Sequence, residues 1–449
     1  MPKVLVIGGN AAGMTAAGRA RRLDPGLEVT VLERGPHVSS SVCGTPYFIS
    51  GDVPRAENLI RYTPEAFQER RGARVLTGVA AEKLDLSRRR VVARNLETGR
   101  EIAFPYDRLL VATGYAPRRI EAAGAELGNI FSLANLSDAL AIRSALERRP
   151  QRALLVGAGL VNLEMAESLS RRGVAVTMLE KCDHIVPGLD PEMADLVEAE
   201  LARHGVAVWK GRSVRTFFGN PDGRVQSAWV SGIAEPVAAD IVLVDIGVRP
   251  ETGLARAAGI ALGRSGAIAV SERLETSAPS IYAAGNCAET LHLVSNQPVA
   301  NALGTAANKQ GRVAGENLAR VPAVFRGVLN TWVVRVFDAA VARTGLTEQE
   351  ARACGFLPVA AQITAGARAR YLGEEPVTLR AIADRASRRL LGVQAVGGGA
   401  DKRVDVAAVA LTAGMKVDEA AQLDLGYAPP YSQVWDPFLV AMNALLRYL

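Results

Sequence analysis

One cysteine stands out in this sequence as a candidate reactive group. Cys43 lies in the run Ser39-Ser40-Ser41-Val42-Cys43-Gly44-Thr45-Pro46-Tyr47, and no second cysteine follows within a helical turn or two. A thiol attacks sulfur as its thiolate, and a helix N-terminus favours that ionised form. If a helix starts in this run, we expect a lowered pKa for Cys43 and redox chemistry at its sulfur. A buried small residue at a helix start is the structural alternative.

The residues before Cys43 predict a nucleotide-binding unit. Residues 3–7 read as a short strand, 14–23 as a helix, and 29–32 as a second strand that ends at Glu33. Glu33 follows Gly13 by 20 residues, which suits a βαβ site with pyrophosphate at the helix N-terminus and a ribose hydroxyl on the carboxylate. Asn10 takes the middle glycine position. The cofactor-binding residues expected here are Gly8, Ala11, Ala12, Gly13, Glu33 and Arg34.

The same pattern occurs a second time further along the chain. A strand is expected over 153–156, a helix over 163–171, and a strand over 174–179 that ends at Glu180. Two such units predict two dinucleotides, and coincidental Gly-rich turns are the weaker alternative. The carboxylate at each strand end favours a free 2′-hydroxyl, as in FAD or NADH, while Lys181 and Arg172 leave NADPH possible. The residues expected to bind the second nucleotide are Gly157, Gly159, Leu160, Val161 and Glu180. Asn162, at the third glycine position, predicts looser packing of this helix on its sheet.

Three further strands end in turns of small residues. The strands are expected at 109–111, 241–246 and 281–283. Such turns bring the backbone close to a flat cofactor, so Thr113, Gly114, Gly247, Gly285 and Asn286 join the predicted cofactor-binding residues.

Composition indicates an ordinary soluble globular protein. The 449 residues are 49% hydrophobic and 22% charged, enough for about three domains. No run approaches about 18 apolar residues, and the chain opens on a strand, so we expect a cytoplasmic protein with neither a membrane span nor a signal peptide. The four cysteines show neither metal-ligand spacing nor a disulfide framework, so no metal is expected, and the three other than Cys43 are expected to be inert.

The net charge of +6 comes mainly from dispersed arginines, which argues against nucleic acid as a partner. A local group is different. Arg19 and Arg22 on the first helix, with Arg61, Arg70 and Arg71 after Cys43, could receive a phosphorylated substrate. A solvated helix face is an equally good interpretation of this pattern.

The order of these motifs resembles the flavoprotein disulfide reductases. Within them, Ser-x-x-x-Cys-x-x-Pro-Tyr at 39–47 looks like the single-cysteine branch of coenzyme A-disulfide reductases, NAD(P)H persulfide and polysulfide reductases, and NADH oxidases and peroxidases. The resemblance implies an α/β fold with two Rossmann-like dinucleotide-binding domains and a C-terminal α+β dimerisation domain. Residues 1–113 and 254–325 would bind FAD, 114–253 would bind NAD(P)H, and 326–449 would form the dimer. Asn286 departs from the acid usual at the flavin ribityl chain, but it can still bond there.

The resemblance also implies a homodimer with shared active sites. The last histidine is His292, so no C-terminal imidazole can protonate a departing thiol. Tyr427, from the partner subunit, would face Cys43 instead, with Tyr371 as a possible second catalytic group; a rigid turn whose aromatics fill the dimer core is the alternative. Coenzyme A would be substrate or bound thiol. The residues that match its contacts are Thr15, Arg19, Arg22, Ser39, Arg71 and Asn301.

The main hypothesis is therefore an FAD-dependent NAD(P)H oxidoreductase that reduces coenzyme A disulfide, or a related persulfide or polysulfide, through Cys43. An NADH oxidase that reduces oxygen is the enzymatic alternative. Relatives that act on peroxide usually carry a histidine in the first Gly-rich loop, whereas this chain has Asn10-Ala11-Ala12, which favours sulfur reduction. A flavin redox sensor that acts through a protein partner is the alternative from another class.

Overall fold

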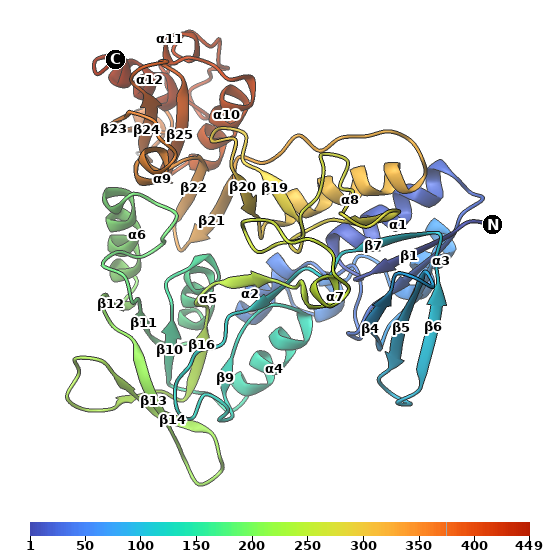
Figure 1. The fold of residues 1–449 in the computed structure, drawn as a ribbon. Helices are drawn as coiled ribbons and strands as arrows, with labels where there is room; N and C mark the ends of the chain where they lie inside the picture. Colours follow the sequence, from blue (N-terminus) through green and yellow to red (C-terminus); the bar gives the residue numbers. More distant parts are fainter. Residues whose placement is uncertain (374) are drawn as a thin grey trace.

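The computed structural model describes residues 1–373 and 375–449. Its N-terminal part is built on a five-stranded parallel sheet with strand order β18-β7-β1-β2-β3 (Figure 1). β1 lies at the centre, with Val6 paired to Val31 of β2 and to Leu110 of β7. The elements are β1 (Lys3–Ile7), α1 (Ala11–Leu23), β2 (Glu28–Leu32), α3 (Pro64–Arg71), β3 (Arg74–Leu76), β7 (Arg108–Val111), β18 (Ile281–Ala283) and α8 (Gly304–Leu318).

Helices α1 and α8 lie side by side against this sheet, although they are far apart in sequence (Figure 1). Glycines allow the close approach. A Cβ at Gly311 would collide with the backbone of Ala12, and one at Gly315 would lie 2.6 Å from Ala16 O. The smaller elements around this part are η1 (Val42–Gly44), α2 (Thr45–Ser50), η2 (Ala56–Leu59), the antiparallel strands β4 (Val79–Asp85), β5 (Arg90–Asn95) and β6 (Glu101–Pro105), α7 (Gly253–Ala257), and the hairpin β19 (Glu289–Leu291) and β20 (Pro298–Ala300).

The middle of the chain forms a second five-stranded parallel sheet, with strand order β12-β11-β10-β16-β9. A two-stranded ribbon of β8 (Tyr115–Pro117) and β17 (Val248–Pro250) connects the two parts. The remaining elements are β9 (Ile130–Phe131), α4 (Leu136–Leu146), β10 (Arg152–Val156), α5 (Leu160–Ser170), β11 (Ala175–Leu179), α6 (Pro191–Arg203), β12 (Ala207–Trp209), β13 (Val214–Gly219), β14 (Val225–Val230), β15 (Val237–Ala238) and β16 (Ile241–Val244).

The C-terminal part is an antiparallel sheet with strand order β21-β22-β25-β24-β23. Helix α10 packs on β22 and β25, and α12 packs on β23 and β24. The elements are β21 (Trp332–Val336), β22 (Ala339–Gly345), α9 (Glu348–Ala353), β23 (Pro358–Gly366), η3 (Arg370–Leu372), β24 (Pro376–Asp384), β25 (Leu390–Gly397), α10 (Ala400–Ala413), α11 (Val417–Ala420) and α12 (Pro437–Leu446). The sheet's edge reaches the second part, because Val334 and Val336 share a core with Met193 and Val197 of α6.

This architecture confirms the expected α/β fold class, with two Rossmann-like parallel sheets followed by an α+β part. In the α+β part, β24 and β25 are antiparallel neighbours, with Val377 opposite Gly397 and Leu379 opposite Ala395. Among the described residues, no helix combines the length and the apolar character needed to cross a membrane.

Candidate active site

Cys43 lies at the start of a helix, as the sequence predicts. It occupies the single turn η1, and α2 follows directly. Its side chain is exposed. The first Gly-rich turn is tied to this segment, because Asn10 Oδ1 accepts hydrogen bonds from Ser40 N and Ser40 Oγ, each at 3.1 Å. The residue that departs from the glycine pattern therefore holds the cysteine segment against the predicted nucleotide turn.

The expected lowering of the Cys43 pKa is wrong for this chain. Surrounding protein still removes enough water to raise the pKa of the thiol, although the residue is exposed, and the nearby Glu164 carboxylate raises it further. A backbone hydrogen bond opposes these effects only in part. Burial is the largest of these effects, so the position at a helix start does not lower the pKa of Cys43 here.

Two side chains near Cys43 escaped the sequence analysis. Tyr47, four residues after Cys43, donates a hydrogen bond from its hydroxyl to Glu164 Oε1 at 3.2 Å. Burial raises the pKa of Glu164 to about 7, with Glu167 adding to the rise and Tyr47 opposing it. Burial and Glu164 also raise the pKa of Tyr47 to about 12. Glu164 is 121 residues from Cys43 and belongs to the second nucleotide unit, so no local pattern could connect the two.

The first Gly-rich turn has the geometry of a nucleotide cradle. A Cβ at Gly8, where φ is +112°, would collide with Ala112 O, and one at Gly13 would collide with Gly8 O. Glu33, at the end of β2, accepts hydrogen bonds from Gly9 N and Gly35 N, both at 2.7 Å. The turn, the N-terminus of α1 and this carboxylate form the arrangement that a dinucleotide requires. Ala11 and Ala12 begin α1, and Arg34 is exposed just after β2.

The turn after β18 contains a buried hydrogen-bond acceptor that no described residue of the chain satisfies. Asn286 Oδ1 is buried and has no hydrogen-bond partner within the described residues. Gly285, at φ +82°, has its N–H bonded to Gln310 Oε1 at 2.7 Å, and a Cβ there would lie 2.9 Å from Ala12 Cβ. An orphaned buried oxygen costs about 1–3 kcal/mol. A bound group that donates a hydrogen bond to Asn286, as a ribityl hydroxyl would, removes this cost.

The turns that follow β7 and β16 are also narrow. Thr113 Oγ1 donates to Glu251 O at 2.5 Å, and Gly114 adopts φ +73°. Gly247, after β16, adopts φ +92°. All three positions lie at the carboxyl ends of parallel strands, where ligands bind in such sheets.

The second Gly-rich turn repeats the first with one addition. Glu180 accepts from Ala158 N and Cys182 N, both at 2.9 Å, and its side chain is buried. Asp245 was not predicted. It follows β16, and a Cβ at Gly159 would lie 2.8 Å from its Oδ2. Burial raises the pKa of Asp245, while backbone N–H groups of Gly247, Asn162 and Val161 lower it in part.

Asn162, at the third glycine position, is tied to its own turn, and the looser packing of this helix stays a prediction. Its side chain is fully buried, and Nδ2 donates to Val156 O at 3.1 Å and to Gly157 O at 2.7 Å. The amide thus fills the space that a glycine would leave and fixes the turn. Arg172 does not point to the nucleotide, because its Nε donates to Ile49 O of α2 at 3.1 Å. Of the two cations thought to allow NADPH, only Lys181, which is exposed, remains beside Glu180.

The predicted substrate residues lie along α1 and its surroundings, and most of them have partners within the chain. Thr15 Oγ1 donates to Asn308 at 2.9 Å, Arg19 pairs with Glu316 at 2.6 Å, and Asn301 Nδ2 donates to Asn330 at 2.7 Å. Arg22 is exposed, and Ser39 adopts φ +51°.

Tyr62 is a further residue that the sequence did not reveal. Arg71 donates to its hydroxyl at 3.0 Å, and the guanidinium carbons of Arg61 and Arg71 lie 5.8 and 5.7 Å from its ring centroid. Hydrogen bonds from these two arginines lower the pKa of Tyr62. Arg70 is exposed on α3. The cationic group after Cys43 is thus organised around an aromatic ring.

Both candidate tyrosines are on the surface of the C-terminal part. Tyr427 is 50% exposed and Tyr371 is 77% exposed. Leu372, Tyr431, Val434 and Trp435 are exposed near them in sequence. So much exposed aromatic and apolar surface is typical of an interface. Of the remaining cysteines, Cys287 is buried, whereas Cys182 and Cys354 are exposed, and their inertness stays a prediction.

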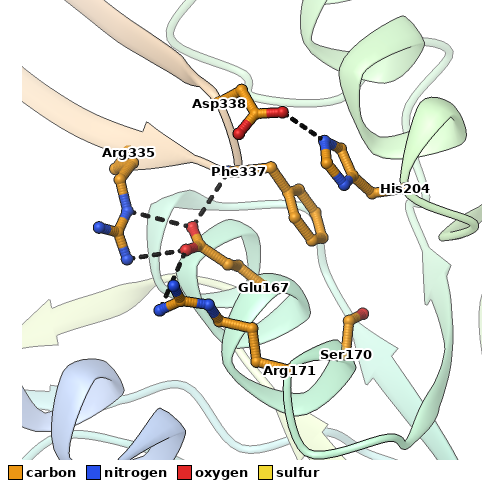
Figure 2. Close-up of a pocket in the computed structure, with 7 residues that line it drawn as sticks. All are labelled: Glu167, Ser170, Arg171, His204, Arg335, Phe337 and Asp338. Carbon is orange, nitrogen blue, oxygen red and sulfur yellow. Dashed lines mark hydrogen bonds and ion pairs between the residues drawn. The ribbon is translucent and has the colours of Figure 1, made fainter. Parts of the chain in front are cut away.

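An open cavity of about 500 Å³ lies between α5, the end of α6 and the β21–β22 turn (Figure 2). Seven residues line it: Glu167, Ser170, Arg171, His204, Arg335, Phe337 and Asp338. His204 Nε2 lies 3.3 Å from Glu200 Oε1 and 3.2 Å from Asp338 Oδ2, and its ring stacks on Phe337. Glu200, His204 and Asp338 lie close enough together to share a cation, but each already has an ion-pair partner. That the protein binds no metal stays a prediction.

Comparison with known proteins places this geometry in a family. The model of the pyridine nucleotide-disulphide oxidoreductases matches residues 2–311, and the model of their dimerisation domain matches residues 332–437. The chain belongs to the pyridine nucleotide-disulphide oxidoreductase family. It is an oxidoreductase that uses a pyridine nucleotide, and it carries the family's dimerisation domain.

Individual relatives cover almost the whole chain. An NAD(P)H sulfur oxidoreductase (CoA-dependent) of Pyrococcus furiosus is 36% identical over 446 residues, 99% of both chains. An NADH oxidase of Methanocaldococcus jannaschii is 32% identical over 451 residues, 100% of this chain and 99% of the other. The solved structure of an NAD-dependent persulfide reductase from A. fulgidus superimposes with a TM-score of 0.96 and 38% identity, covering 99% of this chain and 83% of that one.

Proposed function

We propose that this oxidoreductase uses FAD and NAD(P)H to reduce coenzyme A disulfide, or a related persulfide or polysulfide, through Cys43. The observation that carries the proposal is an exposed lone thiol beside the first of two dinucleotide cradles. With no second cysteine nearby, Cys43 can form a disulfide only with a sulfur that arrives from outside.

Each nucleotide has its own cradle under this proposal. FAD occupies residues 1–113 and 254–325, where Gly8, Gly13 and Glu33 hold the adenosine diphosphate and Asn286 bonds the ribityl chain. NAD(P)H occupies residues 114–253, where Gly157, Gly159 and Glu180 have the corresponding roles. The buried Glu180 carboxylate, bonded to two backbone N–H groups, supports NADH over NADPH.

The sulfur chemistry takes place at Cys43. The thiolate attacks one sulfur of the substrate, a bond forms between the two sulfurs, and the other half of the substrate leaves and takes a proton. A flavin held by the first cradle would supply the two electrons, taken from NAD(P)H, that reduce the new disulfide. That bond breaks, and the Cys43 thiolate and a second thiol result. In total, one NAD(P)H and one proton convert one disulfide into two thiols.

The substrate class follows from charge and from the relatives. Arg22, Arg61 and Arg70 are exposed near α1 and Cys43. Arginine forks suit phosphate groups, which coenzyme A carries. The Pyrococcus furiosus relative is named as CoA-dependent. We assign Thr15, Arg19, Arg22, Ser39, Arg71 and Asn301 to this substrate, with Arg19 exchanging Glu316 for a phosphate.

The exposed Tyr427 supports a shared site. In a homodimer the apolar face around Tyr427 and Tyr371 is covered by the second subunit, and the phenol of Tyr427 then donates a hydrogen bond to the departing thiolate at the partner's cysteine. The resemblance to the M. jannaschii relative makes an NADH oxidase the second candidate function.

The deciding experiment is anaerobic NADH consumption by the purified protein. Coenzyme A disulfide, a persulfide or no acceptor is added to the wild type and to Cys43→Ser. We expect turnover on a sulfur acceptor that falls at least about a hundredfold in Cys43→Ser, because serine does not form the sulfur–sulfur bond. Absence of anaerobic turnover in the wild type, with brisk oxygen consumption in air, would establish the oxidase instead.

A further inference from the structure

Glu164 is fixed to the helix that directly follows Cys43. Cys43 lies in the turn η1, and Tyr47 lies in the first turn of α2, four residues later. Its hydroxyl donates to Glu164 Oε1 at 3.2 Å. The carboxylate comes from α5, so the hydrogen bond joins the second nucleotide unit to the cysteine segment.

The C-terminal part holds this pair through Arg335. The guanidinium carbon of Arg335 lies 5.2 Å from the centroid of the Tyr47 ring, within the range of a cation–π contact. Its terminal nitrogen pairs with Glu167 Oε1 at 2.7 Å and with Asp52 Oδ2 at 3.4 Å. Glu167 also accepts from Phe337 N at 3.0 Å (Figure 2), so the arginine is anchored from two sides.

Four titratable or charged groups face Glu164. They are Cys43 of η1, Tyr47 of α2, Glu167 of α5 and Arg335 of β21. Tyr47 and Arg335 favour the ionised carboxylate, whereas burial and Glu167 favour the neutral form. The negative form of Glu164 in turn raises the pKa of Cys43.

We propose that Glu164 is a positioning residue that controls the ionisation of the Cys43 thiol, and that Tyr47 and Arg335 hold it in place for this task. An ionised Glu164 makes the Cys43 thiol harder to ionise, and a neutral Glu164 removes that contribution and leaves the effect of burial. The inference rests on the proposed function only because it takes Cys43 as the reacting group.

The charge of Glu164 changes within the working range of pH. With a pKa of about 7, the carboxyl is neutral in mildly acidic solution and ionised in mildly alkaline solution. The wild-type thiol is therefore harder to ionise above about pH 7 than an uncharged neighbour would make it. Glu164→Gln removes the contribution of this charge to the pKa of Cys43. The substitution should therefore have no effect at low pH, where Glu164 is already neutral.

The test measures the thiol without any turnover. The flavin-loaded protein is reduced with dithiothreitol, desalted without oxygen and treated with iodoacetamide between about pH 5.5 and 9.5, because alkylation reports the thiolate. Peptide mass spectrometry follows Cys43, and the exposed Cys182 and Cys354 serve as internal references. Glu147→Gln, an exposed glutamate at the end of α4, is the matched control.

We expect Glu164→Gln to alkylate at Cys43 about threefold to tenfold faster than wild type near pH 8.5 and at the same rate near pH 5.5, since a neighbouring like charge shifts a pKa by about one unit. The wild-type alkylation profile should show an inflection where Glu164 ionises. Tyr47→Phe should move this inflection to higher pH, because it removes a hydrogen bond that lowers the pKa of Glu164, and Arg335→Lys should move it less. If Glu164→Gln loses its flavin, the position of the inflection in Tyr47→Phe tests the inference instead.

A Glu164→Gln to wild-type ratio that stays constant with pH, or one that Glu147→Gln reproduces, would overturn the inference. So would an unmoved inflection in Tyr47→Phe. A protein that shows the expected alkylation profiles but reduces no sulfur acceptor would refute the proposed function and leave the role of Glu164 intact.

Discussion

Glu33 and Glu180 occupy the same place in two separate parallel sheets. Each ends the second strand of a strand–turn–helix–strand unit, and each accepts one hydrogen bond per carboxylate oxygen, from a backbone N–H of the Gly-rich turn and from the N–H two residues after itself. The two carboxylates therefore have the same pattern of backbone hydrogen bonds, and under the proposed function they face different nucleotides. Their roles can be separated by experiment.

Glu180→Gln should weaken the preference for NADH over NADPH by about tenfold, or roughly 1.4 kcal/mol, because the repulsion of a 2′-phosphate is lost. The measurement is kcat/KM for both nucleotides with one sulfur acceptor. Glu33→Gln is the matched control. It should reduce the FAD content and leave the nucleotide preference unchanged. A wild type that already prefers NADPH by more than tenfold would contradict the assignment of Glu180.

Asn286→Leu should lose much of its FAD during purification. Asn286 Oδ1 is a buried acceptor without a partner among the described residues, and leucine removes this acceptor, which a ribityl hydroxyl would bond. The loss of one such bond weakens binding about tenfold. The ratio of flavin absorbance to protein reports the result, and Asn286→Asp should retain the flavin. Full flavin content in Asn286→Leu would show that Asn286 has no such contact.

Tyr427→Phe should lower kcat on coenzyme A disulfide about tenfold or more, since a hydrogen bond to a charged group contributes about 1.5–3 kcal/mol. Reduction of the bound flavin by NADH should stay unchanged. Stopped-flow measurements separate the two half-reactions.

Mixed dimers test whether the site is shared. A dimer of one Cys43→Ser subunit and one subunit with Tyr427→Phe and Tyr371→Phe contains one complete site only if each tyrosine serves the partner's cysteine. Co-expression with two different tags should then restore about half of the wild-type rate, as one of two sites is whole. No recovery would place cysteine and tyrosine in the same subunit.

Asp436→Asn should destabilise the C-terminal part by about 3–5 kcal/mol, because it leaves a buried charge unpaired. Asp436 Oδ2 lies 3.0 Å from Arg403, and both side chains are nearly inaccessible. Asp418→Asn, in the exposed pair with Arg388, is the control and should cost less than about 1 kcal/mol. Chemical denaturation of both variants gives the comparison.

The same carboxylate should make stability depend on pH. Burial alone would raise the pKa of Asp436, but hydrogen bonds from Phe438 N and Ser432 and the charge of Arg403 lower it overall. A lowered folded-state pKa stabilises the protein above the ordinary carboxyl range, and this stability is lost as the pH falls through that range toward the lowered value. Asp436→Asn should show a shallower loss of stability in acid. Parallel curves would contradict this role.

Much of the fold could be predicted because its signals are local. A glycine at positive φ, such as Gly8 or Gly157, is needed wherever a strand turns sharply into a helix, and an acid follows the next strand at a nearly fixed distance. Both signals depend on residue type at short, nearly fixed spacings. The two nucleotide units and the lone thiol at Cys43 were therefore evident from the sequence.

What surrounds those residues was decided only in three dimensions. Arg172 turns away to cap α2, and burial together with Glu164 raises the pKa of Cys43 against the expected direction. Both outcomes depend on neighbours from a distant part of the chain. The sequence by itself determined which groups can do chemistry and in what fold, because these depend on residue type and short spacing. Only the tertiary structure decided their charge and partners, because electrostatics and burial depend on distance through space.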